Sequence, residues 1–385
     1  MSKKKICVII NNRANYARIK SVLTAIQNHK KLQLQLILES SAILPRYGQV
    51  DKTIRKEGFK IDEIIYTVIE GENPTTMAKS AGLAVIELTT LFGNLKPDIV
   101  LTVADRYETL PIAMASTYMN IPLAHTQGGE ITGSIDESVR HSTTKLAHIH
   151  FPATKKSALN LKRLGENPKN IYLTGCPSID LIKNANLNID KKFIKKYSSF
   201  GVGSNLNFSE KYIVVLQHPV TTEYGSGLKQ IKATIDAVKN LNIQVVWLWP
   251  NVDAGSDDIS KGLRIFREND KTKNIKFFKN FEPEDYLKLI NNCSCIVGNS
   301  SSALREGSYL GIPAVSIGTR QQNRECGKNV ITVTHDSKKI RSAIISRIKM
   351  KKFKSEKIYG NGNSGKKIAE VLSKVKIKIQ KKLNY

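Results

Sequence analysis

The stretch that decides the fold is IVGNSSSALREGSYLGIPAVSIGTRQQNRECGKNV, residues 296–330 of a chain of 385. Its first residues predict a short buried strand that ends at Val297 and leads into a Gly-Asn-Ser-Ser turn. A helix over residues 302–310 follows, and after a glycine and a proline a second strand covers residues 314–317. The stretch is therefore a strand-turn-helix-strand unit.

The serine turn of this unit suits an anionic ligand. Gly298 lets the backbone turn sharply and approach a ligand, while Ser300 and Ser301 supply hydroxyls and amides where the helix begins. A helix start carries unpaired N–H groups and partial positive charge, which favour a phosphate. Capping is the commoner role of any single serine there, but three successive serines exceed what a cap requires. Glu306 could reach ribose hydroxyls, and Arg320 leaves the next strand at its carboxyl end.

Outward from this unit, strands and helices alternate along the whole chain. Apolar runs predict strands over residues 6–10, 34–38, 64–67, 99–103, 122–125, 150–152, 171–174, 212–217, 244–249 and 275–278. Helical spacing of apolar residues fills most of the intervals between them. The alternation predicts the α/β class, with two doubly wound, Rossmann-like domains that face each other.

The domain boundaries follow from composition. Residues 1–185 are expected to form an N-terminal Rossmann-like domain, and residues 208–360 a C-terminal nucleotide-binding domain. Between them, residues 184–207 are rich in Asn, Lys, Ser and Gly without an apolar period, which predicts a linker. Residues 361–385 predict a terminal helix, over about 366–382, that packs back on the N-terminal domain.

The net charge of +27 would ordinarily suggest a nucleic-acid partner. The lysines, however, are spread over the chain without interleaved aromatic residues, and no nucleic-acid-binding motif is present, so we expect no nucleic acid. We also expect no membrane partner, because no apolar run approaches a membrane span and the N-terminal run is too short for a signal peptide. Five scattered cysteines without metal spacing predict no metal site and a reducing, cytoplasmic location.

Two polar clusters follow predicted strands in the first half. Residues 104–106, Ala-Asp-Arg, come directly after one strand, and residues 126–130, Thr-Gln-Gly-Gly-Glu, come directly after the next. Ligands of parallel sheets lie at the carboxyl ends of strands, so both clusters are candidates for a site. Asp105 could instead cap a helix, and Asp136 and Glu137 could be first-turn acids favoured by a helix dipole.

Taken together, the motifs resemble a known family. They occur in this order: NRANY at 12–16, ADR at 104–106, HTQGGE at 125–130, GSID at 133–136, RH at 140–141, GCPS at 175–178, QHPV at 217–220, PNVDAGS at 250–256, GNSS at 298–301 and GTR at 318–320. This set is similar to that of the hydrolysing UDP-N-acetylglucosamine 2-epimerases of sialic-acid-type biosynthesis. The resemblance spans nearly the whole chain.

The resemblance implies a glycosyltransferase-B architecture with a nucleotide sugar between the two domains, no metal or redox cofactor, and a homodimer or homotetramer. It also implies a hydrolase acting on an O-glycosyl compound. A proton leaves carbon 2 of the sugar while UDP leaves carbon 1, giving a 2-acetamidoglycal. Water then adds and releases free N-acetylmannosamine, which feeds nonulosonic (sialic-type) acid biosynthesis.

The resemblance also implies roles for individual residues. The catalytic candidates are Asp105, Asp136, Glu137 and His218. The residues expected to bind the substrate and its nucleotide are Arg13, Arg106, Gln127, Glu130, Asn251, Asp253, Ser300, Ser301, Glu306 and Arg320. This assignment fits the chemistry, because proton transfer at carbon needs a carboxylate or histidine and departure of a diphosphate needs cations and donors.

Two positions depart from the expected pattern. Asn15 stands where family members often have Asp, and Gln127 stands where many have Glu. Neither amide can act as a general base, so Glu130 or Asp136 would have to replace a missing base. The alternatives are therefore the same reaction on a modified sugar, such as a UDP- or GDP-linked diacetamido sugar, a non-hydrolysing epimerase, or an inactive nucleotide-sugar-binding protein. A glycosyltransferase of the same fold is a weaker alternative.

Overall fold

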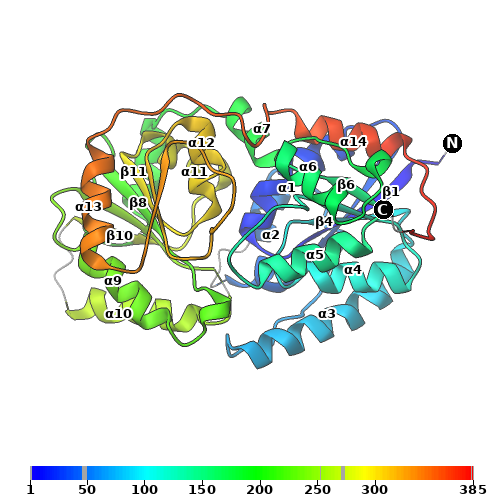
Figure 1. The fold of residues 1–385 in the computed structure, drawn as a ribbon, viewed down its shortest axis with the longest axis horizontal. Coiled ribbons are helices and arrows are strands. Elements are labelled where there is room, and N and C mark those ends of the chain that lie inside the picture. Colours follow the sequence, from blue (N-terminus) through cyan, green and yellow to red (C-terminus); the bar gives the residue numbers. More distant parts are fainter. Residues whose placement is uncertain (1, 46–49, 252, 270–273, 383, 385) are drawn as a thin grey trace. The chain divides into compact units, whose positions relative to one another are not determined.

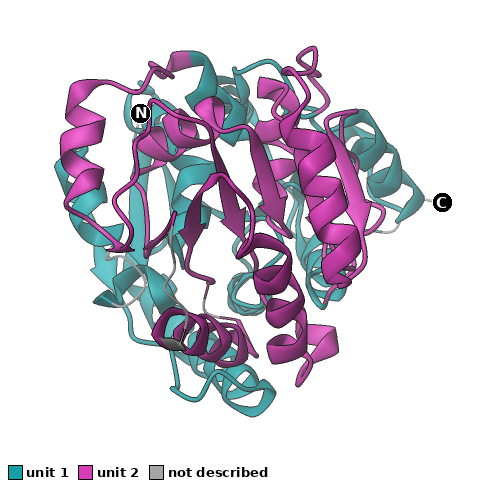
Figure 2. Ribbon diagram, turned by 90° about the vertical axis from the view of Figure 1, so that its left-hand side faces the viewer, with its two compact units in different colours: residues 1–131, 135–183, 359–385 teal, residues 132–134, 184–358 magenta. Residues whose placement is uncertain are grey.

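A computed structural model describes the chain except for residues 1, 46–49, 252, 270–273, 383 and 385. The described chain divides into two compact units, coloured separately in Figure 2. The first unit holds residues 1–131, 135–183 and 359–385, and the second holds residues 132–134 and 184–358. The last segment of the chain thus returns to the first unit (Figure 1).

The first unit is built on a parallel sheet with the strand order β3-β2-β1-β4-β5-β6. The strands are β1 (Lys4–Ile10), β2 (Leu32–Leu38), β3 (Glu63–Ile64), β4 (Ile99–Val103), β5 (Leu123–Thr126) and β6 (Ile149–Phe151). In this order β1 and β5 both flank β4, so the residues that follow these three strands share one edge of the sheet. A doubly wound parallel sheet is what the alternating pattern predicts, and this prediction is confirmed.

Helices cover both faces of this sheet. They are α1 (Arg13–Gln27), α2 (Val50–Lys56), α3 (Pro74–Leu95), α4 (Thr109–Tyr118), α5 (Asp136–Leu146), α6 (Lys155–Arg163), α7 (Pro177–Asn184) and α14 (Ser364–Lys374). Strand β1 shows why both faces are covered: Ile6, Val8 and Ile10 enter the core against α1, while Cys7 and Ile9 enter the core against α3 and α4. Successive side chains point to opposite faces, so an unbroken apolar strand needs a layer on each side.

The C-terminal segment completes the first core. Ile368, Ala369 and Leu372 of α14 are buried in the same cluster as the apolar face of α1. The carboxylate of Asp180 in α7 accepts hydrogen bonds from the backbone N–H groups of Ser364 and Gly365 at 2.9 and 2.7 Å, which caps the start of α14. The helix ends at Lys374, so the expectation of a helix extending to about residue 382 is wrong. The last described residues instead form a tail that lies against the end of α5 and the residues between α5 and β6.

The second unit has a sheet in the order β13-β12-β11-β8-β9-β10-β7, parallel apart from the edge strand β7. Its strands are β7 (Val202–Gly203), β8 (Tyr212–Leu216), β9 (Gln244–Leu248), β10 (Ile275–Phe278), β11 (Cys295–Gly298), β12 (Ala314–Ile317) and β13 (Val330–Val333). Its helices are α8 (Lys191–Ser198), α9 (Gly227–Val238), α10 (Ser256–Asn269), α11 (Pro283–Asn292), α12 (Glu306–Leu310) and α13 (Ser337–Ile348). Here too the doubly wound pattern is confirmed.

The segment expected to be a linker contains a helix. In α8, Phe193 and Tyr197 are four positions apart and pack together against Phe281, with ring centroids 4.8 Å apart in the first pair and 4.3 Å between Tyr197 and Phe281. Two apolar positions surrounded by lysines are too few to reveal a helical period in the sequence. The segment therefore belongs to the fold of the second unit. No helix of the described residues is long and apolar enough to cross a membrane.

Candidate functional site

The polar clusters of the first unit lie where β1, β4 and β5 end. Asn11 and Asn12 follow β1, Asp105 and Arg106 follow β4, and residues 127–130 follow β5. All three strands are neighbours in the sheet, so their ends form one continuous edge. Helix α5, which begins with Asp136 and Glu137, approaches this edge from the loop after β5 and supplies the residue that joins the clusters.

Arg140 of α5 is the centre of this set. Its side chain is fully buried, and its guanidinium pairs with the carboxylate of Asp105. The same group donates to Oε2 of Glu137 at 2.9 Å and to the backbone carbonyl of Glu130 at 2.8 Å. Burial by itself lowers the pKa of Arg140, but the charges of Asp105 and Glu130 outweigh burial and raise it. One cation therefore holds three of the predicted site residues together.

Glu137 has a second partner in the same helix. Its Oε1 lies 2.8 Å from Nε2 of His141, one turn further along α5. The side chain of Glu137 is 29% exposed, whereas that of Asp105 is 6% exposed. Of these two carboxylates, Glu137 is thus the one that a ligand reaches more readily. Asp136 precedes it as the first residue of the helix.

The loop after β5 is held in an unusual backbone conformation. Gln127 has φ of +61° and its N–H donates to the carbonyl of Phe151 at 2.9 Å. Gly129 has φ of +77°, and a Cβ there would lie 2.2 Å from the backbone oxygen of Ser157, so no other residue fits. His125 at the end of β5 donates from Nε2 to the carbonyl of Ala104 at 2.7 Å. Burial lowers the pKa of His125 to about 4, so the ring is neutral at pH 7.

Two acidic residues that the sequence analysis did not select lie at the same edge. Glu108 accepts hydrogen bonds from Arg106, at 3.2 Å to each oxygen, and from the hydroxyl of Ser40 at 3.3 Å. Glu39, directly after β2, is fully buried. Burial and the neighbouring charge of Glu108 raise the pKa of Glu39 to about 8. The sequence could have indicated Glu39 as a site residue, because this acid directly follows the apolar strand β2.

Helix α1 begins at this edge as well. The side-chain oxygen of Asn12 accepts the N–H of Asn15 at 2.8 Å and so caps the helix, which places Arg13 in its first turn. A cation in the first turn is opposed by the helix dipole, and the first turn of α1 contains no acidic residue. An anion bound near Arg13 would remove that mismatch.

In the second unit, His218 is held by two neighbouring loops. Asn299, after β11, accepts the N–H of His218 at 2.7 Å and donates to its carbonyl at 2.8 Å. The backbone N–H of Asn251 donates to Nδ1 of the His218 ring at 3.1 Å. Since Nδ1 accepts, a neutral ring carries its proton on Nε2 and presents a donor there. Asn299, absent from the predicted list, is therefore the residue that orients the predicted histidine.

The serine turn follows β11 as predicted, but the helix after it is interrupted. Ser301–Ala303 form a 3-10 turn, and α12 covers only Glu306–Leu310. The predicted continuous helix over residues 302–310 is wrong, and a five-residue helix provides little dipole. The hydroxyl of Ser300 accepts the N–H of Ser302 at 3.4 Å, as a cap would. Gly298 has φ of +127°, and a Cβ there would lie 2.1 Å from the Leu216 oxygen of β8.

The other predicted residues of the second unit lie in the segments that follow β9, β11 and β12. Arg320 follows β12 and donates to the carbonyl of Asn299 at 3.3 Å, which places it beside the serine turn. Glu306 begins α12 and is 8% exposed, and Asp253 is 9% exposed in the loop after β9. The structure thus joins His218, Arg320 and the serine turn through Asn299. Whether this set and the set around Arg140 bind the same molecule stays a prediction.

Comparison with known proteins identifies the family. The family model described as UDP-N-acetylglucosamine 2-epimerase matches residues 24–373. The chain belongs to this family. A UDP-N-acetylglucosamine 2-epimerase of Neisseria meningitidis serogroup B is 29% identical over 96% of this chain and 95% of its own length. A GDP/UDP-N,N'-diacetylbacillosamine 2-epimerase (hydrolyzing) of Campylobacter jejuni is 32% identical over 86% of this chain and 84% of its own length.

The fold of this 2-epimerase family member is shared with solved structures. A crystal structure of the UDP-GlcNAc 2-epimerase from Neisseria meningitidis, bound to UDP-GlcNAc, has a TM-score of 0.78, with 19% identity over 96% of this chain and all of that one. The predicted glycosyltransferase-B architecture and the predicted family are both confirmed. The roles of individual residues stay predictions, because the comparisons concern whole chains.

Proposed function

We propose that this 2-epimerase is hydrolysing: it releases UDP and a free 2-acetamido sugar with inverted carbon 2 from a UDP-linked 2-acetamido sugar. The observation that carries the proposal is the group of carboxylates gathered on the buried Arg140, in which Asp105 and Glu137 both pair with the guanidinium. A relative whose name includes the word hydrolyzing is 32% identical to this chain, which supports the same outcome.

Proton transfer at carbon 2 is the first demand of this reaction. Glu137 takes the proton, because it is the more exposed carboxylate of the pair and is oriented from both sides by Arg140 and His141. The electron pair of the carbon–hydrogen bond forms a double bond between carbons 1 and 2, and UDP leaves carbon 1 with its bonding electrons. Asp105 stabilises the arrangement through Arg140. When water adds to carbon 1, Asp105 accepts the proton that the water loses and delivers it to carbon 2 on the other face, and Glu137 releases its proton to solvent.

Departure of UDP is the second demand. His218 presents its Nε2 proton, and Arg320 and the hydroxyls of Ser300 and Ser301 lie on loops joined by Asn299. These groups would donate to the diphosphate as negative charge develops on it. Arg13 and Arg106 of the first unit add positive charge, and Asn251, Asp253 and Glu306 are the candidates for the nucleoside.

The free sugar is proposed to be N-acetylmannosamine or its diacetamido counterpart, a precursor of sialic-type acids. The named relatives act on either kind of sugar, so the substituent at carbon 4 is the open choice. A second candidate, an inactive nucleotide-sugar-binding protein, is favoured by a specific observation: amides occupy positions 15 and 127, where a carboxylate would be needed for a base.

The test uses the purified protein with UDP-N-acetylglucosamine, UDP-diacetamido and GDP-diacetamido sugars in D₂O. The expected result is release of UDP together with a free sugar that carries deuterium at carbon 2, seen by NMR. A product that keeps its UDP would make the enzyme non-hydrolysing. Binding without nucleotide release or deuterium incorporation would establish the inactive binder.

We also propose a cytoplasmic homodimer or homotetramer. All five cysteines are described and none forms a disulfide, as is typical of a reducing compartment. Light scattering of the purified protein would give its mass in solution, and a monomeric mass would remove the oligomer from the proposal.

A further inference from the structure

Gln127 is buried at the candidate site without an evident structural use for its side chain. The residue is 1% exposed. Neither Oε1 nor Nε2 has a hydrogen-bond partner anywhere in the part of the chain that the structure describes. Burying an amide without partners destabilises a protein, so the side chain is not explained by stability.

The backbone at Gln127 adds a second cost. Its φ of +61° is a conformation that favours glycine, and a glycine stands at each of the next two positions. The backbone cannot relax away from this conformation easily, because the N–H of Gln127 is held by Phe151 and the carbonyl of Gly129 accepts from Asn160 at 2.9 Å. Strain of this kind persists at functional sites, where the surrounding structure holds it in place.

A second unsatisfied amide lies at the same edge of the sheet. Oδ1 of Asn15 has no hydrogen-bond partner among the described residues, and Asn15 is 5% exposed. Asn15 lies in the first turn of α1, after β1, and Gln127 follows β5, so the two amides come from the strands on either side of β4 and its Asp105. At this edge, two carboxylates are paired with Arg140. The neutral amides of Gln127 and Asn15 have side-chain atoms without a hydrogen-bond partner among the described residues.

We propose that Gln127 recognises the acetamido group of the sugar substrate. Its Nε2 donates to the acetamido carbonyl, and its Oε1 accepts from the acetamido N–H. A primary amide offers both a donor and an acceptor, as this group requires, whereas an ionised carboxylate only accepts and would repel the carbonyl oxygen. Proton transfer is then the task of Glu137 and Asp105. This inference rests on the proposed function, because it names what one residue of that site binds.

The test is a binding cycle that needs no turnover. Calorimetry measures UDP-N-acetylglucosamine and UDP-glucose, which lacks the acetamido group, with the wild-type protein and with Gln127→Met. The variant should bind UDP-N-acetylglucosamine roughly tenfold more weakly and UDP-glucose about equally well, since one neutral hydrogen-bonded group is lost. Its Tm should stay the same or rise, because a buried amide without partners is removed.

The matched control is Gln35→Met, a buried glutamine of the same unit whose Nε2 donates to the carbonyl of Leu95 at 2.9 Å. It should lower Tm and leave the preference between the two ligands unchanged. Equal weakening of both ligands by Gln127→Met, or a wild-type protein that does not prefer UDP-N-acetylglucosamine, would overturn the proposal. So would Gln127→Glu if it raised turnover, because that position would then be a base. If the protein binds UDP-N-acetylglucosamine but does not hydrolyse it, the proposed function is refuted. The calorimetric comparison of the two ligands still tests the role of Gln127, because it does not depend on turnover.

Discussion

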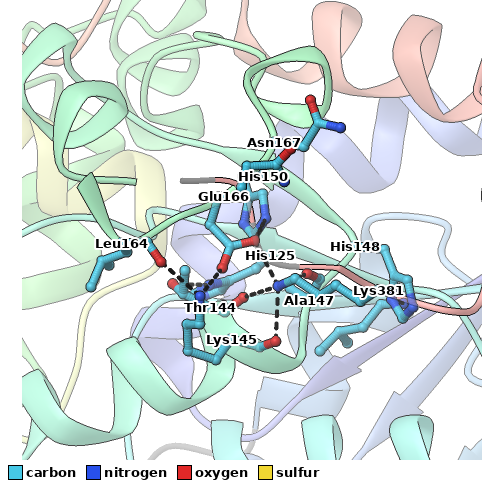
Figure 3. A network of polar contacts seen from close by, with 12 residues as sticks. His125, Thr144, Lys145, Ala147, His148, His150, Leu164, Glu166, Asn167 and Lys381 are labelled. Atoms are coloured by element: carbon cyan, nitrogen blue, oxygen red, sulfur yellow. Dashed lines mark hydrogen bonds and ion pairs between the residues drawn. The ribbon is translucent and has the colours of Figure 1, made fainter. Parts of the chain in front are cut away.

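Two buried glutamates of the first unit have opposite electrostatic surroundings. Glu166 is surrounded by hydrogen-bond donors: His150 donates to it at 2.9 Å, and the ammonium groups of Lys381 and Lys145 lie 2.6 and 3.0 Å away (Figure 3). Burial alone would raise the pKa of Glu166, but these hydrogen bonds lower it to about 2. Burial, together with the charge of a second acid, Glu108, instead raises the pKa of Glu39 to about 8.

The difference separates a structural network from a candidate site. Lys381 of the C-terminal tail also donates to the carbonyls of Thr144, Lys145 and Ala147 at the end of α5, so that network is filled by the protein itself (Figure 3). At the other end of α5, Arg140 pairs with two carboxylates, and among the described residues neither amide atom of Gln127 nor Oδ1 of Asn15 has a hydrogen-bond partner. Polar groups that the protein leaves incompletely satisfied are available to a ligand, and the same helix carries both arrangements.

The largest expected effect is on turnover. Glu137→Gln and Asp105→Asn should each lower the rate of UDP release by roughly 10²–10⁴-fold, because proton transfer at carbon loses its carboxylate. Steady-state assays of UDP release measure this. The matched variant is Glu166→Gln, which should destabilise the fold and leave the rate at 25 °C within a few-fold. Equal losses of rate in all three variants would remove the distinction between the two regions.

The next effect is on stability. Lys381→Met removes the ammonium that joins Glu166 to three carbonyls at the end of α5, and should lower the free energy of unfolding by about 3 kcal/mol, because a buried carboxylate loses one of its charged partners. Urea denaturation followed by circular dichroism gives the value. Lys378→Met, at an exposed position of the same tail, is the control and should change little. If the two variants behave alike, the tail does not stabilise the unit through this ion pair.

The third effect is a pH dependence with opposite signs in the two regions. The raised pKa of Glu39 means that the folded state holds a proton that the unfolded state releases, so its contribution is lost as pH rises from about 4.5 to about 8. The lowered pKa of Glu166 means that its contribution is present above about 4.5 and is lost as pH falls toward about 2. Urea unfolding across these two windows measures both slopes.

Substitution can isolate the Glu39 slope. Glu39→Gln should flatten the fall in stability above about pH 5 by at most about 1.4 kcal/mol per pH unit and leave the acid limb unchanged. Glu166→Gln should flatten only the acid limb. A Glu39→Gln variant with the wild-type slope between pH 5 and 8 would show that Glu39 does not carry the proton.

The smallest effect is expected at His141. His141→Gln keeps a donor near Glu137 on a half-exposed helix surface, so unfolding should change by less than about 1 kcal/mol and the rate by only a few-fold. Comparing the rates of UDP release of His141→Gln and His141→Leu is the sharper measurement, because leucine removes the group that contacts Glu137 and glutamine keeps a donor there. Equal rates in the two variants would mean that His141 is not coupled to the base.

The sequence by itself determined the α/β class, the alternation of elements and the family, because burial on two faces of a parallel strand imposes an apolar run and the motifs recur at strand ends. The sequence did not predict helix α8 or the end of α14 at Lys374. In both segments a few apolar residues stand among lysines, which is too few to show a helical period. The candidate residues lie at strand ends, but their partners could not be read from the chain.

Only the tertiary structure decided those partners. The strand order β3-β2-β1-β4-β5-β6 brings Asp105 against Arg140 and Glu39 against Glu108, and the returning tail brings Lys381 to Glu166. Periodicity records whether a side chain is buried, whereas its charge environment depends on residues far away in the sequence. For that reason the pKa of Glu166 is lowered by its hydrogen-bond partners, whereas that of Glu39 is raised by burial and by the charge of Glu108.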